Sequence, residues 1–277
     1  MDDQILGRSR AVWWRIVGVC LLAALSLLWG CAGKGAGSAG GGRTDLLTES
    51  DESGERKRAR IRLELAVGYF EQGKTAIALD EIKQAIAADP GFSDAYSLRG
   101  LIYMRLNEYG LAEESFNLAL GMDRANSAVL HNLGWLKCQQ GAFVPSFSLF
   151  QAALAQPQYA ERAKTLRALG LCQERAGDPE SALVSLQKSY ELDAGNPVTG
   201  YNLANLLLKK GDLVRSQFYI RRLNNSELAN AESLWLGIKL ERRIGNNEAV
   251  RQLGVQLQKR YPESEQAQRF GRGAFDD

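Results

Sequence analysis

The side chains that most often carry out chemistry in proteins are scarce in this chain of 277 residues, which holds one His and four Cys. The single imidazole, His131, has no Ser, Cys or carboxylate beside it in a recognisable arrangement, so it does not indicate nucleophilic catalysis. The scattered Cys residues do not form a local cluster of zinc ligands. We therefore expect no enzyme activity, no metal, no cofactor and no small-molecule substrate.

A glycine-rich segment gives a formal match to the dinucleotide-binding fingerprint, Gly35-x-Gly37-x-x-Gly40. That motif requires a preceding strand and a following helix, and the sequence indicates neither. A Gly-rich and Ser-rich segment behaves as a flexible coil, so residues 31–58 are interpreted as a tether.

The charge balance argues against nucleic acid as the main partner. The chain has 34 Lys and Arg against 32 Asp and Glu, for a net charge of +2. Proteins that bind nucleic acid usually carry a strong basic excess on one face.

Cys31 is the Cys whose context predicts a covalent modification. The uncharged run at residues 16–30 follows an Arg-containing segment, and it is shorter than the roughly 20 residues of a membrane-spanning helix. This is typical of a signal peptide. The run ends in Leu28-Trp29-Gly30-Cys31, which resembles a bacterial lipobox. Residues 1–30 are therefore predicted to be removed; an uncleaved membrane anchor is the alternative.

The predicted acyl chains on Cys31 also indicate a location. One acyl chain holds a protein only marginally, and a triacylated Cys31 would meet the need for more than one. Ala32 differs from the Asp that acts as an inner-membrane retention signal in enterobacterial lipoproteins. We expect the protein to be anchored in the inner leaflet of the outer membrane, facing the periplasm.

A period of about 34 residues organises the chain from residue 59 onward. One series of small residues, which would let two helices approach closely, comprises Ala66, Gly100, Gly134, Gly170, Ala204 and Gly237. A second series, seven or eight positions later, predicts turns in the left-handed conformation and comprises Gly73, Asn107, Gly141, Gly177, Gly211 and Gly245. Apolar residues between them follow a helical period without strand-like alternation.

These columns resemble the tetratricopeptide repeat, as in Arg99-Gly100…Tyr103…Ala112…Phe116…Ala119. The resemblance covers residues 59–263 in six repeats. It implies an all-α fold, a right-handed superhelical solenoid of about six helix-turn-helix repeats with a concave binding surface. Residues 264–277 are predicted to be a polar tail that caps the last repeat.

The resemblance also implies which side chains face the groove. The ninth position of the repeat is apolar in five of six repeats, and it is flanked by Arg and aromatic residues, a composition typical of binding hot spots. The alternative is that these residues pack against neighbouring helices and contact no partner. The candidate groove residues are Val67, Phe70, Leu101, Met104, Arg105, His131, Trp135, Arg167, Leu171, Arg175, Tyr201 and Leu208.

Two further thiols, Cys138 and Cys172, lie on the first helices of adjacent repeats. A disulfide needs Cα atoms within about 7 Å, whereas neighbouring helix axes are typically 8 to 10 Å apart. A disulfide between them is possible, because an exported protein meets an oxidising compartment. The sequence nevertheless favours two free thiols.

The lipobox, the tether and repeats that begin Arg62…Leu65…Tyr69 together resemble the type IV pilus biogenesis and stability lipoprotein family, PilF/PilW. The stretches at 159–162 and 233–240 are also similar to that family. The resemblance implies a pilotin, an adaptor that helps the type IV pilus secretin to reach the outer membrane or to form multimers. The alternative is a lipoprotein scaffold for tight-adherence pilus assembly or for peptidoglycan hydrolases.

Overall fold

The computed structural model describes residues 52–275. The chain divides after Glu52, and the second unit, Ser53–Asp277, contains every helix described below. The predicted signal peptide at residues 1–30, the lipidation site Cys31 and the tether up to residue 51 lie outside the described residues.

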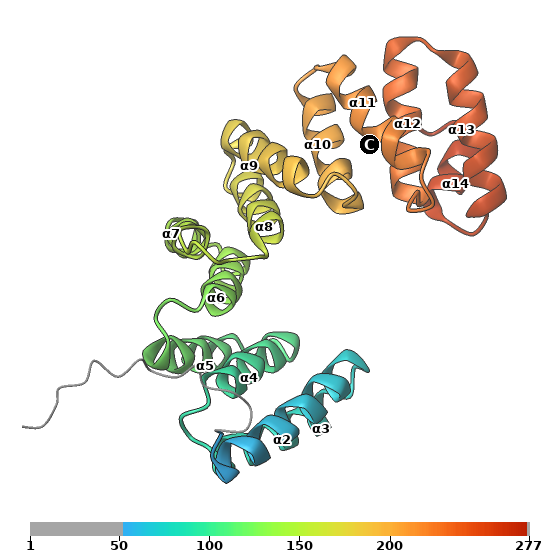
Figure 1. Cartoon of the computed structure of the whole chain (residues 1–277). Coiled ribbons are helices and arrows are strands. Elements are labelled where there is room, and N and C mark those ends of the chain that lie inside the picture. Colours follow the sequence, from blue (N-terminus) through green and yellow to red (C-terminus); the bar gives the residue numbers. More distant parts are fainter. Residues whose placement is uncertain (1–51, 276–277) are drawn as a thin grey trace, which may run out of the picture. The chain divides into compact units, whose positions relative to one another are not determined.

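Six helical hairpins follow one another along the chain (Figure 1). Each pair packs together along its length, and the second helix of each pair packs against the first helix of the next pair. The described residues contain no strand, so the all-α solenoid is confirmed for this part of the chain. The pairs are α2 (Gly54–Glu71) with α3 (Thr75–Ala88), α4 (Ser93–Arg105) with α5 (Tyr109–Met122), α6 (Ser127–Gln139) with α7 (Phe143–Leu154), α8 (Arg162–Arg175) with α9 (Pro179–Leu192), α10 (Pro197–Lys209) with α11 (Leu213–Asn224), and α12 (Ala231–Ile244) with α13 (Asn247–Arg260).

The turn inside each hairpin has the predicted left-handed conformation. The φ angle is 75° at Gly73 and 62° at Asn107, and the other four members of the series are also positive. Asn107 is the one residue among the six that has a side chain, and Asn is among the few residue types that tolerate this region.

The small residues of the first series let the two helices of a pair approach closely. A Cβ atom on Gly100 would lie 2.5 Å from the ring of Phe116, and one on Gly170 would lie 2.7 Å from Leu186. Phe116 and Leu186 are fully buried. The bulky side chain of the second helix therefore occupies the space that the missing Cβ leaves.

The boundaries differ from the prediction at both ends. Helix α2 begins at Gly54, so the last five residues of the predicted tether are helical. Helix α14 (Glu265–Gly271) lies within the predicted polar tail and packs against α12 and α13. Phe270 contacts Gly254, and the ring of Phe275 stacks on Trp235 with centroids 5.7 Å apart. The tail caps the last repeat through aromatic side chains.

The structure joins Cys138 of α6 to Cys172 of α8 in a disulfide, with the Cα atoms 5.8 Å apart. The preference for two free thiols was wrong. Cα atoms lie about 2.3 Å from the helix axis, so two that face each other are several ångströms closer together than the axes are.

Candidate protein-binding groove

Four ninth-position residues form an apolar stripe on the first helices of repeats 1 to 4: Val67, Leu101, Trp135 and Leu171. Val67 is exposed at 38% of its surface, and the other three are half-buried. Consecutive first helices contact one another from α2 to α8, so the stripe is continuous over these helices. In the sixth repeat the equivalent Ile238 is fully buried.

The half-buried stripe residues are held by packing on their inner side. Leu101 packs against the cores around α3 and α5, and Trp135 packs against the cluster that contains the disulfide. The sequence left two interpretations open, contact with a partner in the groove and packing against neighbouring helices. The inner side of each half-buried side chain packs against the core, and its outer side remains available to a partner. A side chain that is already ordered loses little conformational freedom when a partner binds.

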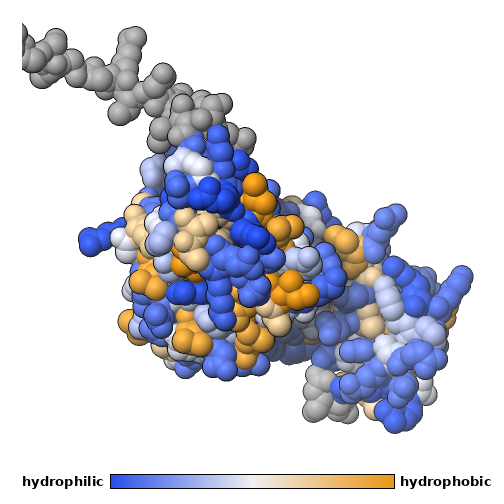
Figure 2. All heavy atoms as spheres, turned by 90° about the horizontal axis from the view of Figure 1, so that it is seen from below, coloured by the Kyte–Doolittle hydropathy of each residue, from blue (hydrophilic) through white to orange (hydrophobic). Residues whose placement is uncertain are grey.

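The remaining apolar and aromatic candidates are Phe70, Met104, Tyr201 and Leu208. All four are half-buried and pack against core clusters. Together with the stripe they extend across five repeats, so they form an elongated face and not a compact pocket. Figure 2 shows hydrophobic side chains in separate patches among hydrophilic ones on one face of the molecule.

Basic residues near the ends of first helices link one repeat to the previous one. The guanidinium of Arg105 lies 3.8 Å from the ring centroid of Phe70, and it also donates to the Phe70 carbonyl. Arg243 makes the equivalent hydrogen bond to the Leu208 carbonyl at 3.1 Å. A cation at a helix C-terminus is favourable because the last carbonyls have no partner within the helix. Arg105 is thus fixed in place beside the apolar stripe.

Two other predicted Arg residues are on α8. Arg167 is half-buried and Arg175 is exposed. Close to Arg175, Lys209 of α10 pairs with Glu174 of α8 at 2.9 Å. The face formed by α8 and α10 is therefore more charged than the face formed by α4 and α6.

His131 does not lie in the groove. Its side chain is 7% exposed, packs against Phe150, and has Nδ1 2.8 Å from Thr165 Oγ1. The pKa of His131 is lowered from 6.5 to about 4, mainly because burial disfavours the charged imidazole; the positive charges of Lys164 and Arg167 contribute to this lowering, and Glu161 opposes it. We correct the prediction of a groove residue, because this imidazole is an internal packing group.

The buried imidazole predicts a loss of stability in acid. Because the folded state has the lower pKa, the unfolded state takes up the proton first, and stability falls as the pH drops below 6.5 toward 4. We expect the free energy of unfolding to fall by about 2 kcal/mol between pH 7 and pH 5. Urea titrations at both pH values measure it. His131 is the single His of the chain, so a His131→Gln variant that keeps the same loss would contradict the assignment.

Comparisons with known proteins support the assignment of the repeats and show which repeat proteins this chain is similar to. A family model described as tetratricopeptide repeat matches residues 63–128. The type IV pilus assembly protein PilF of Pseudomonas aeruginosa is 27% identical over 235 residues, which cover 83% of this chain and 93% of PilF. The chain is a tetratricopeptide repeat protein that is similar to PilF.

Two solved structures extend this similarity to the fold. The structure of P. aeruginosa PilF covers 80% of this chain and 100% of its own length, with a TM-score of 0.71 and 27% identity. PilW, described as a widely conserved type IV pilus biogenesis factor, covers 76% of this chain and 97% of its own length, with a TM-score of 0.70 and 28% identity. The similarity therefore extends over nearly the whole length of each solved structure.

The helices and side chains of residues 52–275 bear on membrane insertion and on metal binding. None of the helices described there is both long enough and apolar enough to cross a membrane. Within the same range, no three His, Cys, Asp or Glu side chains come together in a way that could hold a metal ion.

Two buried polar residues in the last two repeats were not predicted from the sequence. Asn224 of α11 and Glu241 of α12 are both almost fully buried. A signal was present in the sequence, because the position of Asn224 holds an apolar or aromatic residue in the other five repeats: Ile86, Leu120, Leu154, Tyr190 and Leu257.

Proposed function

We propose that the chain is an outer-membrane lipoprotein adaptor, a pilotin, that binds the type IV pilus secretin and promotes its localisation or multimerisation. This role would support pilus biogenesis and twitching motility. The observation that carries the proposal is the similarity to PilF and PilW, which spans the repeat array and nearly all of both relatives.

The apolar stripe supplies the surface that would hold a secretin segment. Tetratricopeptide arrays bind partners along extended surfaces. The half-buried rings and aliphatic side chains of the stripe are already ordered, and Arg105 is fixed next to them. An extended or helical segment with apolar residues would cover the stripe, with its polar groups near Arg105 and Arg167.

The lipid anchor would supply the second half of the function. Acyl chains on Cys31 would hold the protein at the outer membrane, and the tether would let the repeat array reach its partner in the periplasm. A bound secretin subunit would then be kept next to the membrane in which it assembles.

Variants of the stripe test the binding surface. We expect Trp135→Ala and Arg167→Ala each to weaken secretin binding about tenfold or more, because aromatic and Arg residues dominate binding hot spots. Val144→Ala is the matched control, since Val144 is 76% exposed on the second helix α7. Binding is measured by pull-down and titration, after circular dichroism has shown that each variant is folded. Equal binding by all variants would remove the stripe from the proposal.

A deletion strain tests the role in the cell. We expect loss of secretin multimers and of twitching motility, with rescue by the wild-type gene but not by a Cys31→Ser variant. Unchanged multimers in the deletion strain would refute the proposal. Copurification of a peptidoglycan hydrolase or a tight-adherence assembly protein in place of the secretin would favour the alternative scaffolds.

A further inference from the structure

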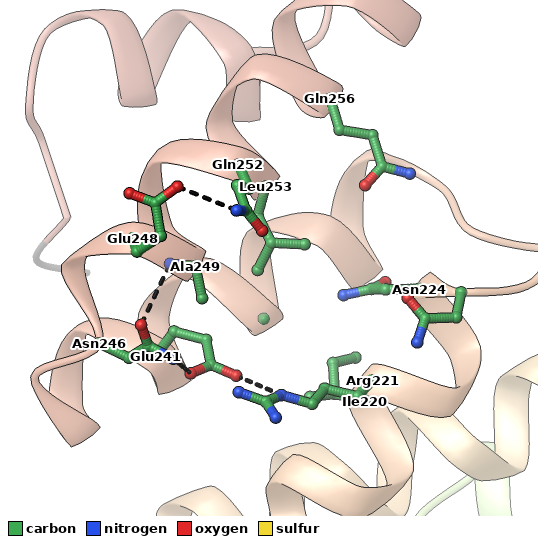
Figure 3. Close-up of a pocket in the computed structure, with 12 residues that line it drawn as sticks. Ile220, Arg221, Asn224, Glu241, Asn246, Glu248, Ala249, Gln252, Leu253 and Gln256 are labelled. Carbon is green, nitrogen blue, oxygen red and sulfur yellow. Dashed lines mark hydrogen bonds and ion pairs between the residues drawn. The ribbon is translucent and has the colours of Figure 1, made fainter.

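A polar cleft lies between the second helices of the last two repeats. Helices α11 and α13 both pack against α12, and the space between them forms a cavity of about 430 Å³ (Figure 3). We call it the α11–α13 cleft. Its floor is formed by Gly237 and Glu241 of α12, and its walls are formed by Ile220, Arg221, Asn224, Asn225, Asn246, Glu248, Ala249, Gln252, Leu253 and Gln256.

The cleft continues toward the C-terminal ends of α11 and α13. A shallower hollow shares Asn224, Asn225 and Gln256 with it and reaches as far as Arg260. Helix α13 has 14 residues, which correspond to about 21 Å. An extended peptide rises about 3.3 Å per residue, so roughly six residues would fit along the cleft.

Asn224 is an unusual residue for its position. Its side chain is 5% exposed, and Nδ2 donates to the Ser233 carbonyl at 3.0 Å. Its Oδ1 atom is buried without a hydrogen-bond partner. A buried acceptor that lacks a partner destabilises the folded state, and an aliphatic residue at this position, as in repeats 1, 2, 3 and 6, would avoid that cost. The amide is therefore not explained by stability.

Glu241 places a buried carboxylate at the floor of the same cleft. It is 1% exposed, and it accepts hydrogen bonds from Arg221 Nε at 2.8 Å, from Gln217 Nε2 at 3.0 Å and from Asn246 Nδ2 at 3.1 Å. Figure 3 shows Arg221 and Glu241 directed toward each other. The carboxylate orients Arg221, whose side chain is still half exposed at the mouth of the cleft.

The side-chain amides at the mouth of the cleft can form hydrogen bonds with the N–H and C=O groups of a polypeptide main chain. The amide side chains of Asn225 and Gln256 can each donate and accept, and neither makes a side-chain hydrogen bond within the described residues. The charges are mutually neutralised, since Glu241 pairs with Arg221 and Glu248 pairs with Arg251. None of the twelve lining residues is aromatic, so no ring is available to stack on a sugar.

We propose that the α11–α13 cleft binds an extended peptide segment of a partner protein, mainly through hydrogen bonds from side-chain amides to the peptide main chain. This site is separate from the apolar stripe, because it is lined by α11 and α13 and not by the first helices of repeats 1 to 4. It does not depend on the pilotin role.

A display library of random heptapeptides, selected against the full mature protein, tests the proposal. We expect enriched peptides whose affinity falls about tenfold or more in Gln256→Ala and in Asn224→Leu. Gln256 is half-buried at the mouth, so its variant is expected to fold normally. Gln187→Ala, at an exposed amide on the second helix α9, should bind as wild type does.

Backbone methylation tests the main-chain contacts directly. N-methylation of central amides in an enriched peptide removes donors without changing side chains, and we expect it to weaken binding about tenfold or more. The proposal is overturned if no peptide is enriched, if binding is unchanged in Gln256→Ala and Asn224→Leu, or if it is lost in Trp135→Ala instead. Binding of peptidoglycan fragments at the cleft with no peptide binding would also overturn it.

Discussion

Replacing Phe116 by Ala is expected to lower the free energy of unfolding by about 3 to 5 kcal/mol. Phe116 is fully buried, and its ring fills the space beside Gly100 where α4 and α5 approach each other. Because Gly100 has no side chain, it has no atoms that could fill the space that the ring leaves. The substitution therefore combines lost apolar burial with a cavity that does not collapse.

The matched control for this prediction is Phe218→Ala. Phe218 is 57% exposed on α11, so its removal should change the free energy of unfolding by less than about 1 kcal/mol. Urea denaturation followed by circular dichroism measures both variants. Equal losses for the two would contradict the packing role of Gly100 and Phe116.

Removal of the Cys138–Cys172 disulfide is expected to lower the free energy of unfolding by about 3 to 4 kcal/mol. The bridge closes a loop with a sequence separation of 34 residues, and without it the unfolded chain gains conformational freedom. Ser146 Oγ, which lies 3.4 Å from the Cys172 sulfur and donates to the Gly134 carbonyl, should keep its place in the double variant. A Cys138→Ser, Cys172→Ser protein should therefore remain folded but unfold at a lower urea concentration.

Thiol titration and reduction provide the check on the disulfide. The mature wild-type protein, unfolded without reductant, should show no free thiol from Cys138 or Cys172. Reductant should destabilise the wild type to the level of the double variant and leave the double variant unchanged. Two free thiols in the unreduced wild type would contradict the bridge.

The repeat architecture could be predicted from the sequence because each column has a steric cause that acts locally. A left-handed turn restricts its residue to Gly or Asn, as at Gly141 and Asn107, and close helix contact restricts its residue to a small one, as at Gly100. These constraints recur in every repeat, so several independent positions report the same fold.

The burial of His131 and the disulfide depend on how the helices of neighbouring repeats are oriented. The sequence of a single repeat does not determine that orientation. The sequence placed His131 at a groove position, but α8 brings Thr165 over the imidazole and encloses it. The sequence also placed Cys138 and Cys172 on adjacent helices, and only the orientation of α6 and α8 decides that their sulfurs meet. The sequence predicted which residues form the apolar stripe. It did not predict the exposed fraction of each side chain, because that fraction depends on the neighbouring helix.

The covalent link between repeats 3 and 4 has a mechanical consequence. In a stacked array each repeat touches only its neighbours, so a pulling force between the two ends passes through every interface in series. The interface between α6 and α8 is cross-linked, whereas the other interfaces between repeats rest on non-covalent contacts alone. Under tension, rupture would therefore begin nearer one end, and the central pair of repeats would be the last to separate.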